Sequence, residues 1–113
     1  MSEIFEDIVG LDKIIHEPAR LAILTVLSSC ISADFTFLQR LTGLTQGNLS
    51  GHLLKLEEAK LIEINKKIVK KRPNTTIKLT PLGKTSIERH WKQLEDLRER
   101  SRVWTKEDQS SPE

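Results

Sequence analysis

The side chains best suited to chemistry in this sequence are hydrogen-bonding and cationic groups, and they fall in two stretches. Residues 45–58 contain amides, hydroxyls and a lysine, and residues 66–72 hold five cations and no acid. Amide side chains can pair with the edges of adenine bases, and cations and hydroxyls with phosphate oxygens. The two stretches together indicate contacts with double-stranded DNA.

Catalytic patterns are missing from the sequence. The three histidines, His16, His52 and His90, are far apart and form no H-E-x-x-H motif, and no Gly-rich phosphate loop or Gly-x-Ser-x-Gly occurs. Cys30 is the only cysteine, so it supplies neither an internal disulfide nor a zinc-ligand pair, and its apolar surroundings predict a buried side chain. We therefore expect no enzyme activity, no catalytic residues, no cofactor and no metal. A metal site built across a dimer from His and Asp remains an alternative.

The charge of the chain is unevenly distributed. The formal net charge is only +2, but residues 36–80 carry nine basic and three acidic side chains. Residues 1–35 carry two basic and six acidic side chains, and residues 81–113 carry seven of each. The positive charge therefore coincides with the two polar stretches, as phosphate binding requires.

The length of 113 residues leaves room for one domain and its ends. No stretch approaches the roughly 18 apolar residues of a membrane span. Residues 1–11 are acidic and lack the apolar core of a signal peptide. These features predict a soluble, cytoplasmic protein without membrane contact.

The first polar stretch predicts a turn followed by a capped helix. Gly43 can adopt the left-handed conformation that ends a helix, and the hydroxyl of Thr45 can cap the next one. Leu49, Leu53 and Leu56 then recur at i, i+4 and i+7 as one apolar stripe. Two helices joined by such a turn form a helix-turn-helix, whose second helix can enter a major groove.

Periodicity and turn residues predict the neighbouring elements. The predicted helices cover residues 3–15, 18–30, 37–42 and 81–100, and the predicted strands cover residues 33–35, 61–64 and 76–79. Thr36 and Gln39 have the spacing of a capping box. A basic hairpin tip at Lys70–Asn74, with Pro73 in its loop, joins the last two strands. A reading helix followed by a basic hairpin is the layout of a winged helix.

The apolar residues predict one small core and two further faces on the terminal helices. The expected core side chains are Leu21, Leu24, Leu27, Leu38, Leu41, Leu49, Leu53 and Leu56, with Phe37 beside Leu38 and Leu41 on the inner face of its helix. The terminal faces would leave exposed patches on a monomer, which predicts a two-fold homodimer on an inverted-repeat site. The residues expected in that interface are Ile4, Phe5, Ile8, Leu11, Ile87, Trp91, Leu94 and Leu97.

Helical geometry identifies the side chains that face away from the apolar stripe. The residues expected to contact DNA are Thr45, Gln46, Gly47, Asn48, Ser50, Gly51, Leu54, Lys55, Lys70, Lys71, Arg72 and Asn74. Two outward glycines indicate either close approach of the helix to DNA or tolerance of a weak position. Arg72 suits a narrow minor groove. Leu54 can touch a thymine methyl or pack under the hairpin, and His52 is expected to be packed and hydrogen-bonded.

Several of these segments resemble the small winged-helix transcriptional regulators of the MarR/ArsR-like group. The resemblance covers about residues 15–97 and rests on Gly47-Asn48-Leu49-Ser50, His52-Leu53, Lys55-Leu56-Glu57-Glu58-Ala59, Leu61-Ile62-Glu63, Arg72-Pro73, Thr75-Thr76 and Leu79-Thr80-Pro81-Leu82-Gly83. It implies an α+β, mainly helical, winged helix-turn-helix fold and a homodimer that binds double-stranded DNA. Two positions depart from the group: Lys60, where glycine is usual, and Leu54, where a polar residue is common.

The expected organisation is an N-terminal helix at 1–15, a winged-helix core at 16–80, a C-terminal helix at 81–104 and a polar tail at 105–113. The main hypothesis is a sequence-specific transcriptional regulator. One alternative is a winged-helix module that binds proteins, because fold does not dictate function. Another is a regulator with a site for a small-molecule effector of unknown identity at the dimer interface.

Overall fold

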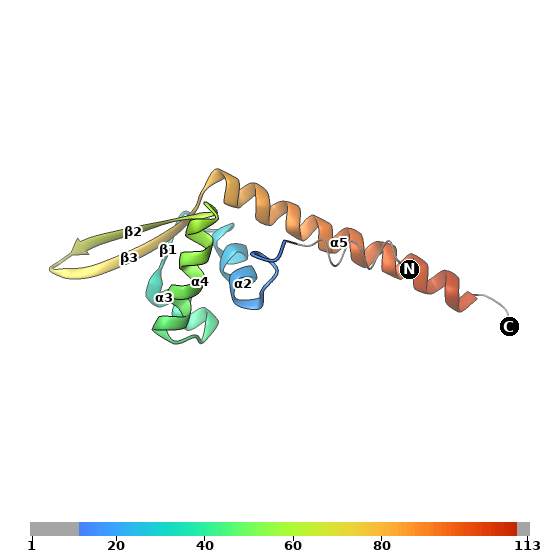
Figure 1. The fold of residues 1–113 in the computed structure, drawn as a ribbon, viewed down its shortest axis with the longest axis horizontal. Coiled ribbons are helices and arrows are strands. Elements are labelled where there is room, and N and C mark those ends of the chain that lie inside the picture. The colour runs from blue at the N-terminus through green and yellow to red at the C-terminus, as the bar shows by residue number, and fades with distance from the viewer. Residues whose placement is uncertain (1–11, 111–113) are drawn as a thin grey trace.

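The computed structural model describes residues 12–110, with side chains through residue 103. The described elements are α2 (Pro18–Leu27), β1 (Ala33–Asp34), α3 (Phe35–Thr42), α4 (Gln46–Glu58), β2 (Ile62–Val69), β3 (Arg72–Leu79) and α5 (Pro81–Ser110) (Figure 1). The fold is α+β and mainly helical, as predicted. The interface positions predicted at Ile4, Phe5, Ile8 and Leu11 lie outside the described residues.

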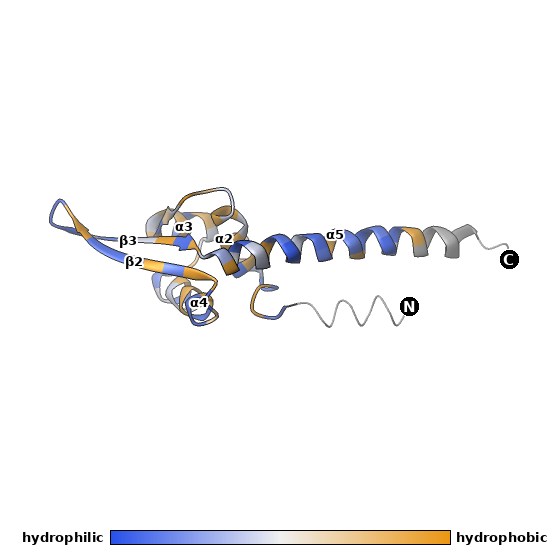
Figure 2. Ribbon diagram, turned by 90° about the horizontal axis from the view of Figure 1, so that it is seen from above, coloured by the Kyte–Doolittle hydropathy of each residue, from blue (hydrophilic) through white to orange (hydrophobic). Residues whose placement is uncertain are grey.

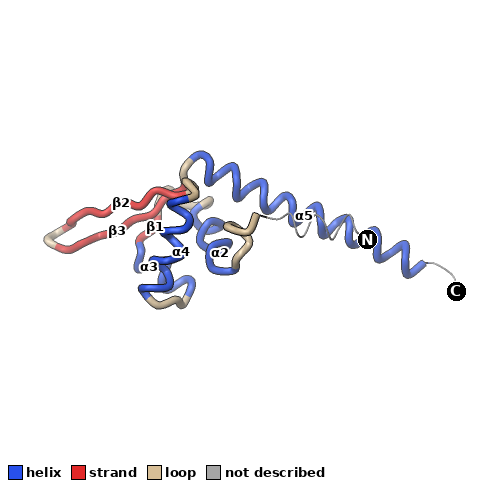
Figure 3. Tube along the Cα trace, in the orientation of Figure 1, coloured by secondary structure: helices blue, strands red, loops and turns tan. Residues whose placement is uncertain are grey.

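Three short helices form the centre of the molecule, and two long elements leave it in opposite directions. Figure 1 shows the β2–β3 hairpin projecting to one side of α2, α3 and α4, and α5 projecting to the other. Figure 3 shows the same arrangement by secondary structure, with the red hairpin and the blue α5 on opposite sides of the helices. We call the β2–β3 hairpin, residues 62–79, the wing.

The sheet has three antiparallel strands in the order β1-β3-β2. Its hairpin is longer than predicted, since pairing continues from Ile62 opposite Leu79 to Val69 opposite Arg72. The turn is therefore only two residues long, and Pro73 is paired in β3 rather than placed in the loop. The predicted five-residue tip was wrong because Lys70 and Lys71, with φ of 52° and 65°, occupy left-handed positions that usually favour Gly or Asn.

The core lies where α2, α3 and α4 meet the base of the sheet and the start of α5. Its buried side chains are Ile15, Ile23, Leu24, Leu27, Ala33, Leu38, Leu49, Leu53, Leu56, Leu61, Ile62, Ile77 and Ile87. The apolar stripe predicted for α4 is confirmed. On α3 only Leu38 is buried, and the predictions for Phe37 and Leu41 were wrong because these side chains turn toward solvent.

The caps around α4 follow the residues predicted for them. Gly43 ends α3 with φ of 70°, and the Thr45 hydroxyl accepts a hydrogen bond from Asn48 N at 3.2 Å. After α4, Lys60 takes φ of 64° and Leu61 N donates to Leu56 O at 3.0 Å. This is the Schellman helix end, so Lys60 adopts the conformation that glycine usually supplies.

The start of α5 is fixed against the end of α4. Thr80 Oγ1 accepts from Gly83 N at 2.9 Å and donates to Lys60 O at 2.7 Å, so its predicted capping role is confirmed. A side chain on Gly83 would clash with the carbonyl oxygen of Leu61. The helix that follows reaches Ser110, beyond the predicted end near residue 100 and into the predicted polar tail.

Two predicted helices had the wrong boundaries before the helix-turn-helix. The prediction of a helix over residues 3–15 was wrong for its last residues. Residues 13–15 form a turn, in which Asp12 Oδ1 accepts from Ile14 N and Ile15 N. Helix α2 stops at Leu27.

Past the end of α2 the chain turns outward. Ser28 Oγ donates to Thr25 O at 2.6 Å in the last turn of this helix. Cys30 is consequently exposed instead of buried, and Ile31 is 94% exposed.

The predicted capping box of α3 was also wrong. The helix begins at Phe35, two residues early, with Asp34 at the N-cap position and no side-chain cap. Thr36 therefore lies inside the first turn, and its spacing from Gln39 has no capping role. Separately, among residues 12–110 no helix is long and apolar enough to span a membrane.

Candidate nucleic-acid interface

The outward surface of α4 is polar and open to solvent. Thr45, Gln46, Gly47, Asn48, Ser50, Gly51, Leu54 and Lys55 are all exposed. Burial of Leu49, Leu53 and Leu56 on the opposite side fixes this orientation. Every residue of α4 that the sequence assigned to DNA contact is therefore accessible to a ligand.

Packing within the described part of the chain does not require the two glycines of α4. A side chain at Gly47 or at Gly51 would meet nothing within 4 Å. In a helix interior, glycine destabilises by roughly 1 kcal/mol relative to alanine. What the two glycines provide is a helix surface on which a ligand can approach the backbone closely.

Capping does not occupy the amide side chains at the start of α4. Thr45 provides the cap, while the side chains of Gln46 and Asn48 form no hydrogen bond within the described residues. The capping role at the start of α4 is thus filled by Thr45. Both amides remain available to pair with base edges.

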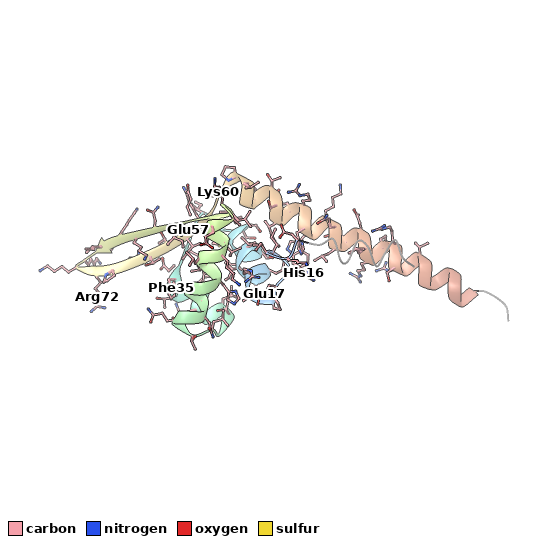
Figure 4. The ribbon with its side chains drawn as sticks, in the orientation of Figure 1. His16, Glu17, Phe35, Glu57, Lys60 and Arg72 are labelled. Carbon is pink, nitrogen blue, oxygen red and sulfur yellow. The ribbon has the colours of Figure 1, made fainter. Side chains whose placement is uncertain are left out.

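The wing carries a cluster of cations toward its free end. Lys66, Lys67, Lys70, Lys71 and Arg72 are all exposed. Figure 4 shows Arg72 at the outer end of the hairpin, far from α5. Figure 2 shows hydrophobic residues close to the same end, where Ile68 is 80% exposed. The tip is therefore a mixed cationic and apolar surface.

An open groove of about 730 Å³ joins α4 to the wing. Gln46, Ser50, Leu54 and Glu57 line it from α4, Ile64, Lys66, Pro73, Asn74 and Thr75 from the wing, and Phe35 and Thr36 from α3. Leu54 stays half exposed beside the hairpin, and Asn74 is half-buried. Figure 4 shows Glu57 and Phe35 on the side of the central helices that bears the wing. The helix and the wing therefore form one continuous surface.

A second polar cluster, behind α4, was not expected from the sequence. Arg20 is buried and its Nη1 lies 2.9 Å from His52 Nδ1, while Glu17 Oε1 lies 3.8 Å from the same nitrogen. The expectation that His52 is packed and hydrogen-bonded is confirmed. The sequence did contain a signal for this cluster, because Arg20 is an arginine within an otherwise apolar helix pattern.

The predicted dimer positions on α5 have different environments. Ile87 is 1% exposed within the core, so the chain's own side chains already cover it and it is unavailable to a partner. Leu97 is also buried. Leu94 is half-buried, and Trp91 is 40% exposed while its Nε1 donates to Thr25 Oγ1 at 2.8 Å.

The histidines do not assemble into a common site. His16 lies beside His90 and His52 lies beside Arg20. Within the described part of the chain, no three His, Cys, Asp or Glu side chains are placed to hold a metal ion.

The sequence matches known proteins over most of its length. The family described as winged helix DNA-binding domain matches residues 19–97. An uncharacterized protein of Methanocaldococcus jannaschii is 36% identical over 78 residues, which cover 69% of this chain and 85% of that protein.

Solved structures share the fold. The transcriptional regulator homologue protein from Pyrococcus horikoshii has a TM-score of 0.77 at 30% identity, with 88% of this chain and 96% of that chain covered. The putative transcriptional regulator ytfH from Salmonella typhimurium has a TM-score of 0.65 at 20% identity, covering 85% and 86%. The transcriptional repressor CouR, solved bound to a 23-mer DNA duplex, has a TM-score of 0.64 at 21% identity, covering 82% and 66%. The chain therefore belongs to the winged helix DNA-binding domain family, and its predicted resemblance to winged helix-turn-helix transcriptional regulators is confirmed.

Proposed function

We propose that this protein is a sequence-specific transcriptional regulator that binds an inverted-repeat operator in double-stranded DNA as a homodimer. The observation that carries the proposal is the continuous surface made by α4 and the wing. On it, exposed amides of α4 lie beside a groove whose other wall belongs to the cationic wing. A structural neighbour of the same fold, CouR, was solved on a DNA duplex.

In this proposal α4 reads bases in the major groove. Gln46 and Asn48 offer paired donor and acceptor atoms to adenine, and Ser50 reaches a base or a phosphate. Leu54 contacts thymine methyl groups, because it is half exposed where the helix borders the groove. Lys55 binds a phosphate. Thr45 is exposed at the start of α4 and lies close to the DNA, but its hydroxyl is already used to cap the helix.

The wing contributes affinity and minor-groove contact. Lys70, Lys71 and Arg72 neutralise phosphates, and the guanidinium of Arg72 enters a narrow minor groove. Two lysines in left-handed positions cost roughly 1–2 kcal/mol each relative to glycine, which supports a role for their charge at the tip. Asn74 lines the protein groove between α4 and the wing, close to the wing tip. In the complex its side chain contacts the sugar-phosphate backbone of the DNA strand that passes there.

The homodimer depends on α5. This helix of 30 residues, about 45 Å in length, has its main contacts within the described elements with α2 and β3, near its own start. Trp91 and Leu94 remain partly exposed on it. A second copy packed against them would bury apolar surface and set two reading helices one DNA turn apart.

Selection of bound duplexes from a random DNA pool tests this function. We expect enrichment of an inverted repeat whose half-sites are about 10 base pairs apart from centre to centre. Recovery of unenriched DNA, or of a single asymmetric half-site, would refute the proposed mode of binding.

A further inference from the structure

Arg20 is a buried cation whose side-chain partners connect three parts of the molecule. It is 7% exposed and lies in the first turn of α2. Nε donates to the carbonyl oxygen of Ile14, Nη2 donates to Lys13 O at 3.5 Å, and Nη1 contacts His52 Nδ1 at 2.9 Å. One guanidinium thus links the segment before α2, the helix α2 itself and the middle of α4.

The contact with His52 requires a neutral imidazole. A guanidinium has only donors, so Nδ1 of His52 must be the acceptor and its ring hydrogen must lie on Nε2. The charged groups that face the ring are Arg20 and Glu17 from the start of α2, and Lys55 lies one turn along α4.

The position of His52 on α4 gives this hydrogen bond a geometric consequence. Asn48 and Lys55, which flank the outward surface, are four residues before and three residues after it, on neighbouring turns. The leucine stripe of α4 packs without strong directionality, whereas a hydrogen bond prefers a narrow range of angles. The buried leucines set which face of α4 points outward, and the Arg20–His52 contact adds a directional restraint on the rotation of the helix and so on the direction in which Asn48 projects.

We propose that Arg20 is a positioning residue for DNA reading, which acts through the neutral ring of His52. The inference rests on the proposed function, since it explains how the reading surface of α4 is held. It assigns a role in base discrimination to two residues that lie behind the helix.

The test measures the ratio of affinities for a selected duplex and a scrambled duplex, at pH 8 and constant salt with the full chain. His52→Asn should keep most of the wild-type ratio, because the amide oxygen replaces Nδ1 as the acceptor for Arg20. His52→Leu should lower the ratio about 10-fold or more at pH 8, as should Arg20→Met if it folds.

Two controls separate this role from general stability and from the proposed function. His16→Asn, at a histidine outside the contact, should keep the wild-type ratio of affinities, with folding followed by circular dichroism. A folded His52→Leu protein with full discrimination, or a folded His52→Asn protein that loses as much discrimination as His52→Leu, would overturn the role of Arg20 and leave the proposed function intact. A wild-type protein that shows no preference for any duplex at pH 8 would overturn the proposed function as well.

Discussion

His16 and His90 are joined by a contact of 3.1 Å between Nδ1 and Nε2, which connects the segment before α2 to α5. The rings are tilted by 51° with their centroids 5.2 Å apart. His90 is 1% exposed, and among the described residues its Nδ1 has no hydrogen-bond partner. The tautomer in which His90 donates from Nε2 to His16 is therefore favoured, because it leaves no unpaired N–H inside the protein.

This pair predicts that stability decreases in acid. Burial and the neighbouring His16 lower the pKa of His90 below its usual 6.5, and Asp12 opposes them only in part. Below about pH 6.5 the unfolded chain therefore binds more protons at His90 than the folded chain does. The free energy of unfolding is at its full value above that pH and decreases as the pH falls below it. The slope for one proton is at most about 1.4 kcal/mol per pH unit. Urea unfolding from pH 8 to pH 5 measures it.

The His90→Phe variant is the control for this slope. It removes the titrating ring and its unpaired nitrogen, so the part of the slope due to His90 should disappear. An unchanged slope in this variant would assign the acid sensitivity to other groups.

Gly51→Ala should have opposite effects on stability and on DNA binding. A methyl group at position 51 meets open space, so the fold should gain roughly 1 kcal/mol. If α4 approaches DNA closely, the same methyl group should weaken binding to a selected duplex. Thermal unfolding and duplex titration measure the two effects. A stabilised variant with undiminished affinity would favour the other interpretation of Gly51, tolerance of a weak position.

Removing the cations of the wing tip should weaken binding to every duplex. Replacing Lys70, Lys71 and Arg72 with Ala should flatten the slope of log affinity against log salt by at least about 2–3 units, since each neutralised phosphate contributes about 0.9. The matched control replaces Lys84, Arg89 and Lys92, exposed cations of α5, and should leave the slope unchanged. Equal slopes in the wild type and the wing variant would support the alternative of a protein-binding module.

Trp91→Glu should produce monomers with much weaker operator binding. The substitution places a charge on the partly exposed surface of α5, and it also removes the hydrogen bond to Thr25. Thr25→Val removes that hydrogen bond, together with the one from Thr25 Oγ1 to Leu21 O, but it introduces no charge and should remain dimeric. Sedimentation at micromolar concentration separates the outcomes. A wild-type monomer, or a dimeric Trp91→Glu protein with full affinity, would reject the proposed dimer.

Local signals in the sequence were sufficient for the helix-turn-helix. Gly43, Thr45 and the leucine stripe of α4 each act within a few residues, so their roles could be predicted and are confirmed. The two-residue turn of the wing could not, because lysine at Lys70 and Lys71 contradicts the usual preference for Gly and Asn at left-handed positions.

Contacts between distant residues account for what the sequence did not reveal. Arg20 meets His52 across 32 positions, and His16 meets His90 across 74, and neither spacing leaves a periodic pattern. Ile87 was predicted to face a partner because periodicity identifies an apolar face without identifying what covers it. The exposed Cys30 follows from a helix that ends at Leu27, where the apolar run gave no stop signal.

The most direct test of the account is fluorescence anisotropy titration of a selected duplex and its scrambled counterpart at one physiological salt concentration. We predict that the wild type binds the selected duplex at least about 10³-fold more tightly. Asn48→Ala and Gln46→Ala should each remove about 1–3 kcal/mol of that preference while the proteins stay folded, because both side chains are exposed. Equal affinity of the wild type for the two duplexes would contradict the claim that α4 reads DNA sequence.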